Sequence, residues 1–301
     1  MESVQADPVL KCTKIMEHQL GFQTVMRRFL KGDEGMVHDV IYWLKHHSEK
    51  EGIFNYIADQ TGFTLNDLVS YDAKHNEENG ENNQDGPDYN FSWNCGAEGP
   101  SRKRAVTELR KHQIRNAFFL VLLAQGTPCI LAGDEFGNTQ NGNNNCYCQD
   151  NEMFWLDWTK LEKNQELFKF FQYMIAFRNK HEIIRKRLPE AQCGMAPVHA
   201  HDVNADNVNL PENARTIGMS FAGYDEKMGR DDMTYMCINA YWADVSITLP
   251  RLPEDMCWYL YVNTYGDYEE KYCYSEEEAV RIDGGFNMKP RSVAVFAAKP
   301  R

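Results

Sequence analysis

The sequence predicts an α/β segment that is followed by an all-β segment. Two short apolar runs, Ile53–Asp59 and Thr127–Ala132, are each followed by a long polar loop or turn region and then by a long amphipathic helix. Strands and helices that alternate in this way are typical of parallel βαβ units. From about residue 186, short runs rich in β-forming residues alternate with Gly, Pro and Asp clusters, which is typical of an antiparallel β domain. We expect the change between the two near Arg185–Gly194.

Two helices are expected before the first apolar run. Phe22–Leu30 has its apolar residues at helical spacing, and Lys31 and Gly32 supply a basic residue and a glycine that can end the helix. Met36–Leu44 is a second candidate, with its apolar residues on one face. Residues 1 to about 20 carry no clear pattern.

The first α/β unit begins at Ile53–Asp59, a run that resembles a buried strand whose carboxyl end opens onto a site. Gly62 breaks this strand, and Thr64–Ser70 is expected to form a short helix with Thr64 as its N-cap. The polar loop Tyr71–Trp93 follows, and Arg102–Gln125 is expected to form a long helix.

The second unit repeats this order. Thr127–Ala132 is expected to be a buried strand, and the acidic residues Asp134 and Glu135 come directly after it. The irregular loop Gly137–Trp158 is followed by an expected helix over Leu161–Arg185.

Strand–loop–helix units with long loops after each strand indicate a (β/α)8 barrel. A whole barrel takes roughly 250 residues, so we expect residues 1–185 to hold about three of the eight units. Residues 186–301 are expected to form an antiparallel β-sandwich. Its strands are expected at Thr216–Phe221, Met233–Asn239, Ser246–Leu249, Trp258–Val262 and Ser292–Ala297.

Composition limits the classes of partner. A formal charge of −12 argues against nucleic acid, whose phosphates need a basic surface. The nine cysteines are scattered, which favours free thiols in a reducing cytosol over a zinc site. The N-terminus lacks the pattern of a signal peptide, and no apolar run has the length of a membrane span. We therefore expect a cytoplasmic protein with no membrane contact, and no motif indicates a metal or cofactor.

The loop Tyr71–Trp93 has a composition suited to binding. It is dense in Asn, Asp, Glu and Gly and ends with the aromatic residues Tyr89, Phe91 and Trp93. Amides and carboxylates suit vicinal hydroxyls, and aromatic faces suit a sugar ring. A solvated loop held by Asx turns is an equal alternative. A calcium loop is a poorer match, because Ser92 stands where the closing Glu belongs.

Three stretches carry a family resemblance. FQTVMRRFLKGDEGMV, SYDAKHNEENGENNQDGPDYNFSWNCGAEGP and GTPCILAGDEFGNTQNGNNNCYCQDNEMFWLDW together resemble the C-terminal half of isoamylase-type glycogen debranching enzymes. This family belongs to the α-amylase superfamily of glycoside hydrolases. The resemblance runs from about residue 21 to 185, and the β domain takes the place of the family's C-terminal sandwich.

The resemblance implies hydrolysis of α-1,6 branch linkages in a glycogen-like α-glucan with retention of configuration. It places a nucleophilic Asp after the fourth barrel strand, an acid/base Glu after the fifth and a stabilising Asp after the seventh. We expect the first two to be absent from this chain. At the third position Thr61 replaces Asp and Gln60 replaces His, while His18-Gln19-Leu20 replaces a Trp-Asn-Asp. A hydroxyl cannot supply the charge that an oxocarbenium-like transition state requires.

Several residues are candidates for the site. Asp59, two residues before Thr61, is either a substitute carboxylate or a hydrogen-bonded cap of the strand end. Candidate sugar contacts, each with a structural role as its alternative, are His75, Asn76, Asp134, Glu135, Asn145 and Trp93.

We therefore expect the C-terminal portion of a debranching enzyme that is inactive as this chain alone and whose ligand is a branched α-glucan. The alternatives are a non-catalytic glucan-binding or regulatory partner, or one half of a split enzyme completed by a separate polypeptide. Because a partial barrel exposes strand edges and apolar helix faces, we also expect oligomerisation, aggregation or a partner chain.

Overall fold

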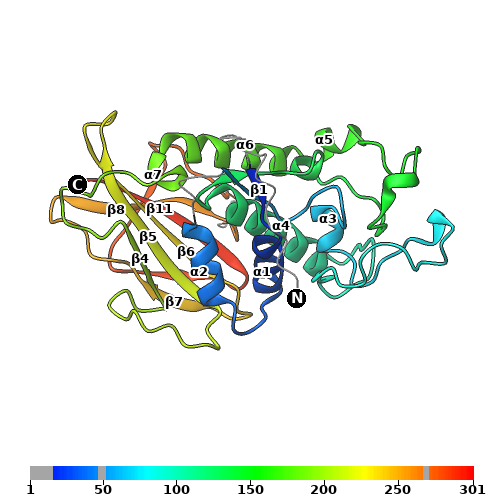
Figure 1. Ribbon diagram of the computed structural model, residues 1–301. Helices are drawn as coiled ribbons and strands as arrows, with labels where there is room; N and C mark the ends of the chain where they lie inside the picture. The colour runs from blue at the N-terminus through cyan, green and yellow to red at the C-terminus, as the bar shows by residue number, and fades with distance from the viewer. Residues whose placement is uncertain (1–15, 47–51, 267–270) are drawn as a thin grey trace, which may run out of the picture.

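The computed structural model describes residues 16–46, 52–266 and 271–301. Its α/β part is built on a parallel sheet of three strands, β1 (Met16–His18), β2 (Gly52–Asn55) and β3 (Thr127–Pro128), with β2 in the middle. The antiparallel strands of the second part lie beside it (Figure 1). This confirms the predicted order of an α/β segment and a β domain.

The strands of the parallel sheet differ from the prediction. β1 was not expected at all. The strand expected at Ile53–Asp59 pairs only as far as Asn55, after which the chain bends away while staying buried. The strand expected at Thr127–Ala132 pairs only over two residues, because the chain then turns into a short 3₁₀ segment.

The two N-terminal helices are confirmed as α1 (Leu20–Lys31) and α2 (Val37–Lys45). α1 buries Phe22, Met26 and Phe29 on one side, as the apolar spacing predicts. It ends at Gly32, whose φ of 93° is the left-handed conformation that glycine adopts without strain.

The next helices are α3 (Leu65–Leu68) and α4 (Arg104–Leu122). Thr64 caps α3 as predicted, since its hydroxyl accepts a hydrogen bond from the Asp67 backbone N–H at 3.1 Å. The loops contain three single-turn 3₁₀ helices, η1 (Glu77–Asn79), η2 (Asp134–Phe136) and η3 (Cys146–Cys148).

The single helix predicted over Leu161–Arg185 is wrong. It is divided into α5 (Thr159–Lys163), α6 (Gln165–Lys180) and α7 (Glu182–Arg185). Asn164 interrupts it where its side-chain amide donates to the Phe136 carbonyl at 2.8 Å. His181 interrupts it where the imidazole Nδ1 lies 2.7 Å from Asp232 Oδ1 of the β domain. Tertiary contacts at two polar side chains thus break the helical periodicity.

The β domain contains a six-stranded antiparallel sheet in the order β4-β5-β6-β11-β8-β9, and a two-stranded sheet of β7 and β10. The five predicted strands are confirmed, and β4, β9 and β10 were missed. The strands are β4 (Val198–His201), β5 (Thr216–Asp225), β6 (Arg230–Asn239), β7 (Val245–Thr248), β8 (Met256–Asn263), β9 (Val280–Ile282), β10 (Gly285–Met288) and β11 (Ser292–Pro300).

Side chains alternate across the large sheet. Ile217 and Met219 of β5 join the apolar core that contains the helices, whereas Tyr235 and Phe296 join a second cluster with Ile247 of β7. The six-stranded sheet is therefore packed on both faces. The predicted boundary near residue 186 falls between α7 and β4, and the first apolar core extends across it.

Within the described residues, none of the helices combines the length and the apolar character that crossing a membrane requires. The cysteines of the described residues are free thiols, and Cys12 lies outside them.

Candidate functional site

The carboxyl ends of β1, β2 and β3 lie at one edge of the parallel sheet. In barrel enzymes this edge carries the reacting groups. The residues that the three strands deliver there are His18 at the end of β1, Tyr56–Thr61 after β2 and the segment ending in Asp134 and Glu135 after β3. We call this set the strand-end cluster.

Asp59 is a buried carboxylate that holds a turn. Its Oδ1 accepts hydrogen bonds from both the backbone N–H and the hydroxyl of Thr61, each at 3.0 Å. Its Oδ2 lies 3.9 Å from Nε2 of His18, whose ring stacks on Tyr56 with centroids 3.7 Å apart. The strand ends at Asn55, so Asp59 lies in the bend that follows it. The geometry is that of a strand-end cap.

Thr61 is exposed at the rim, as is Gln60. Its hydroxyl donates to Asp59 rather than facing a partner on another strand. The position at which the resemblance expects a stabilising Asp is therefore held by a neutral group whose hydrogen is already committed.

Arg27 lies beneath this turn and was missed from the sequence. Its Nε donates to the Ile57 carbonyl at 2.7 Å and its Nη1 to the Asn90 carbonyl at 3.1 Å, so α1 holds both the end of β2 and the polar loop. Burial lowers the pKa of Arg27 to about 10, and the Asp59 carboxylate acts in the opposite direction. The sequence signal that could have identified Arg27 is its position next to Met26, where a cation falls on the apolar face of a predicted helix.

Asp134 and Glu135 are engaged with the backbone. Asp134 is 3% exposed, and its Oδ1 accepts from the Leu65 backbone N–H at 2.8 Å at the start of α3. Burial raises the pKa of Asp134 to about 8. Glu135 Oε2 accepts from the Gly133 backbone N–H at 2.8 Å. Both carboxyl groups thus support the local structure.

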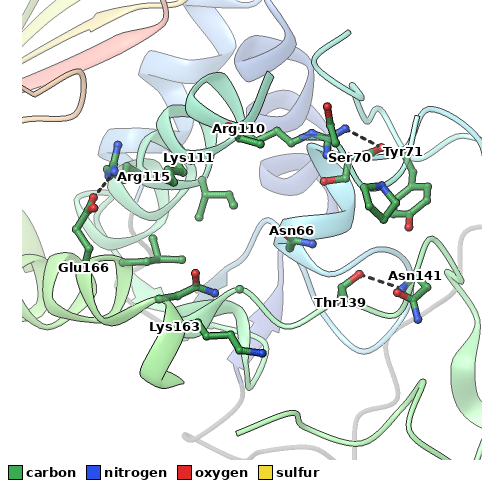
Figure 2. A pocket seen from close by; sticks show the side chains of 17 residues that line it. Asn66, Ser70, Tyr71, Arg110, Lys111, Arg115, Thr139, Asn141, Lys163 and Glu166 are labelled. Atoms are coloured by element: carbon green, nitrogen blue, oxygen red, sulfur yellow. Dashed lines mark hydrogen bonds and ion pairs between the residues drawn. The ribbon is translucent and has the colours of Figure 1, made fainter. Parts of the chain in front are cut away.

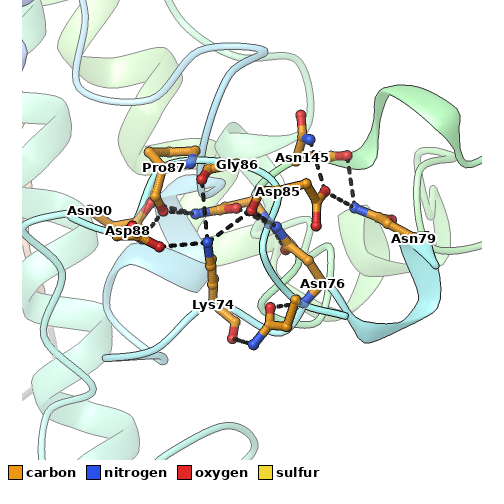
Figure 3. Close-up of polar contacts among 11 residues, drawn as sticks. Lys74, Asn76, Asn79, Asp85, Gly86, Pro87, Asp88, Asn90 and Asn145 are labelled. Atoms are coloured by element: carbon orange, nitrogen blue, oxygen red, sulfur yellow. Dashed lines mark hydrogen bonds and ion pairs between the residues drawn. The ribbon is translucent and has the colours of Figure 1, made fainter. Parts of the chain in front are cut away.

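A network of side-chain amides joins the two polar loops (Figure 3). Asn76 has no exposed surface, and its amide donates to the Asp85 carbonyl at 2.9 Å and to Asn144 Oδ1 at 2.8 Å. Asn76 Oδ1 in turn accepts from the Asn144 backbone N–H at 2.9 Å. Since Asn76 is enclosed, its side chain ties the loops together and does not reach the rim as a sugar contact.

Asn145 belongs to the same network. Its amide donates to Asp85 Oδ2 at 2.9 Å, and the amide of Asn79 donates to the same oxygen at 2.7 Å. These two hydrogen bonds hold the pKa of Asp85 below its ordinary value. No group of three or more His, Cys, Asp or Glu side chains within the described ranges is arranged to bind a metal. The Asp85 carboxylate is thus held by side-chain amides.

His75 and Trp93 have different surroundings. His75 is half-buried, with Nε2 3.2 Å from Glu98 Oε1, and its backbone N–H donates to the Gly142 carbonyl at 2.7 Å. Trp93 packs against the apolar core, and the Arg291 guanidinium of the β domain lies 4.9 Å from its ring centroid. Trp93 therefore contacts the β domain. Exposed aromatic side chains of the two polar loops, residues 71–93 and 137–158, include Tyr89, Tyr147, Trp155 and Trp158.

The fold is shared with solved structures. A pullulanase from Paenibacillus barengoltzii, in complex with maltohexaose and α-cyclodextrin, matches with a TM-score of 0.62 and 22% identity. The match covers 95% of this chain and 39% of the pullulanase. The parallel sheet, its helices and the β domain thus have the fold of part of a (β/α)8 barrel with a C-terminal β domain.

Known sequences narrow this class. A scan of family models gives no match. Isoamylase 3 of Oryza sativa is 35% identical over 249 residues, which cover 79% of this chain and 30% of the relative. The glycogen debranching enzyme of Erwinia tasmaniensis is 49% identical over 138 residues, which cover 46% of this chain and 20% of the relative. The chain belongs to the isoamylase-type glycogen debranching enzyme family, and it spans about a third or less of the length of these relatives.

Proposed function

We propose that these 301 residues provide the last units of the catalytic barrel and the β domain of an enzyme that hydrolyses α-1,6 branch linkages in an α-glucan. The family membership and the barrel edge formed by β1, β2 and β3 support the reaction class. We further propose that the chain does not perform the reaction alone.

The state of the strand-end carboxyl groups carries the second part of the proposal. A retaining glycosidase needs an ionised nucleophile and a proton-donating acid about 5 Å apart on either side of the bond. Here Asp59 caps a turn, Asp134 is buried, and Glu135 is bound to the backbone. The exposed residues after β2, Gln60 and Thr61, have no charge. The nucleophile and the acid must then come from outside these residues.

Purified chain incubated with pullulan or glycogen tests this directly. No release of reducing sugar is expected, because none of the described strand-end carboxyl groups is placed to protonate the bond or to attack it. The full-length debranching enzyme from Erwinia tasmaniensis serves as the positive control. Release of reducing sugar by the pure chain would refute the proposal.

A second candidate is glucan binding without catalysis, either as a regulatory partner or as one half of a split enzyme. The exposed Tyr89, Tyr147, Trp155 and Trp158 on the two polar loops favour it, because aromatic faces stack on sugar rings. Electrophoresis through gels with and without glycogen separates the cases: a glucan binder is retarded by glycogen, and a chain that needs a partner for binding is not.

A further inference from the structure

A cavity of about 410 Å³ lies between α3, the first half of α4, the loop after η2 and the start of α6 (Figure 2). Its volume is within the usual range of small-molecule sites. None of the strand-end cluster lines it, so it is separate from the barrel edge on which the proposed hydrolysis depends.

The cavity carries positive charge in an acidic chain. Arg110, Lys111, Arg115 and Lys163 line it, against the single carboxylate of Glu166, although the whole chain has a formal charge of −12. Glu166 pairs with Arg115 at 2.5 Å, and Lys111 pairs with Glu108 at 3.1 Å. The guanidinium of Arg110 donates only to backbone carbonyls, among them that of Gly99 at 2.8 Å, and it has no ion pair within the described part of the chain. The positive charge is therefore only partly compensated.

Polar side chains at the same cavity have unused hydrogen-bonding capacity. The amides of Asn66 and Asn141, the hydroxyl of Ser70 and the ammonium of Lys163 make no hydrogen bond or ion pair to another described residue. Figure 2 shows them coming from α3 and the turn after it, the loop after η2 and the end of α5. Ile114, Leu167 and Tyr71 add apolar surface. Amides and hydroxyls match the hydroxyl groups of a sugar, and ammonium groups match a phosphate.

We propose that this cavity binds a hexose monophosphate. The phosphate lies toward the lysines and is attracted by the uncompensated charge of Arg110. The ring hydroxyls contact Asn66, Ser70 and Asn141. The site is an effector site, independent of whether the chain takes part in hydrolysis.

Isothermal titration calorimetry of the full chain tests the ligand class with four probes: glucose 1-phosphate, glucose 6-phosphate, maltose and inorganic phosphate. At least one hexose phosphate is expected to bind about tenfold more tightly than maltose or inorganic phosphate, since a charge-assisted hydrogen bond corresponds to about that factor. Its affinity should fall with added NaCl. Absence of binding, or maltose binding as tightly as both hexose phosphates, overturns the proposal.

Two substitutions test the place of binding. Asn66→Asp adds a negative charge with little change of shape, and Lys163→Met removes an exposed charge with no partner to lose. Each is expected to weaken hexose phosphate binding about tenfold. Lys169→Met removes another exposed lysine, on α6 outside the cavity; it is the control and should bind as the wild type does. Thermal melts verify folding. Unchanged affinity in Lys163→Met, or equal weakening in Lys169→Met, overturns the assignment.

Discussion

Asp134 shows how burial alters a carboxyl group beside the strand ends. It is held against α3 by the Leu65 backbone N–H, and burial raises its pKa from an ordinary 3.8 to about 8. Between these two values the folded state holds one more proton than the unfolded state. The free energy of unfolding must therefore fall as the pH rises through this window.

Asp134→Asn should remove that dependence, because an amide keeps the hydrogen-bond acceptor and cannot ionise. The free energy of unfolding of the variant minus that of the wild type is expected to increase by at least ~1 kcal/mol from pH 5 to pH 8. One pKa unit corresponds to about 1.4 kcal/mol. Urea unfolding at several pH values measures it. Asp157→Asn is the control. Hydrogen bonds from Thr159 hold the pKa of Asp157 low, so the effect of this substitution on the free energy of unfolding should be constant over this pH range. A constant difference for Asp134→Asn would contradict the explanation.

Single residues also show the limit of sequence reasoning at the site. Thr61 could be placed by its motif, and the structure shows it exposed at the end of β2. Asn76 is enclosed because it contacts a segment about 70 residues away in the sequence. Arg27 is buried where it contacts a segment about 30 residues away. Such contacts leave no local pattern, so the same amide-rich composition fits both a sugar contact and a structural link.

At the scale of elements, the amide network makes the two polar loops one unit. Asn76→Ala removes hydrogen bonds to Asp85 and Asn144 and leaves buried groups unpaired. The substitution is expected to lower the free energy of local opening of the loops by ~2 kcal/mol. Limited digestion with chymotrypsin should then cleave both loops, at Tyr89 and Tyr147, at least about tenfold faster.

Glu81→Ala provides the matched control for this experiment, because Glu81 is exposed in the same loop and its side chain takes no part in the network. Its cleavage rate should equal that of the wild type. If Asn76→Ala is cleaved no faster than Glu81→Ala, the network does not hold the loops.

Helices and caps were predictable where their sequence signal lies within the element itself. The helices α1, α2 and α4 follow from apolar spacing, and the cap of α3 follows from Thr64. The end of β2 was misplaced because apolar residues remain buried after the chain leaves the sheet. The end of β3 was misplaced because the apolar run continues through the half-buried residues 129–131, beyond the last paired residue. The breaks at Asn164 and His181 follow from bonds to Phe136 and Asp232, which helical periodicity does not show.

At the scale of the whole molecule, the parallel sheet is open on one side. All three residues of β1 are exposed, although strands of parallel sheets are usually covered on both faces. Leu20 at the start of α1 is 64% exposed, and Tyr42 of α2 is also exposed. We propose that this surface packs against further barrel units, whether in a longer chain, in a separate polypeptide or in a second copy.

Analytical ultracentrifugation tests that proposal. The purified chain is expected to self-associate, and Leu20→Lys should shift it toward monomer by placing a charge in the apolar contact. Val208→Lys, an equally exposed apolar position in the β domain, should sediment as the wild type does. A wild-type chain that sediments as a stable monomer at all concentrations would contradict the proposal.

The most direct measurement uses a chimera in which this chain replaces the matching C-terminal part of the Erwinia tasmaniensis debranching enzyme. With Thr61 present, the rate of α-1,6 bond hydrolysis is expected to be at least about 100-fold below that of the parent, the scale for losing one electrostatic transition-state contact. Thr61→Asp should recover most of that loss. A chimera that hydrolyses branch linkages equally well with Thr61 and with Asp at this position would contradict the account.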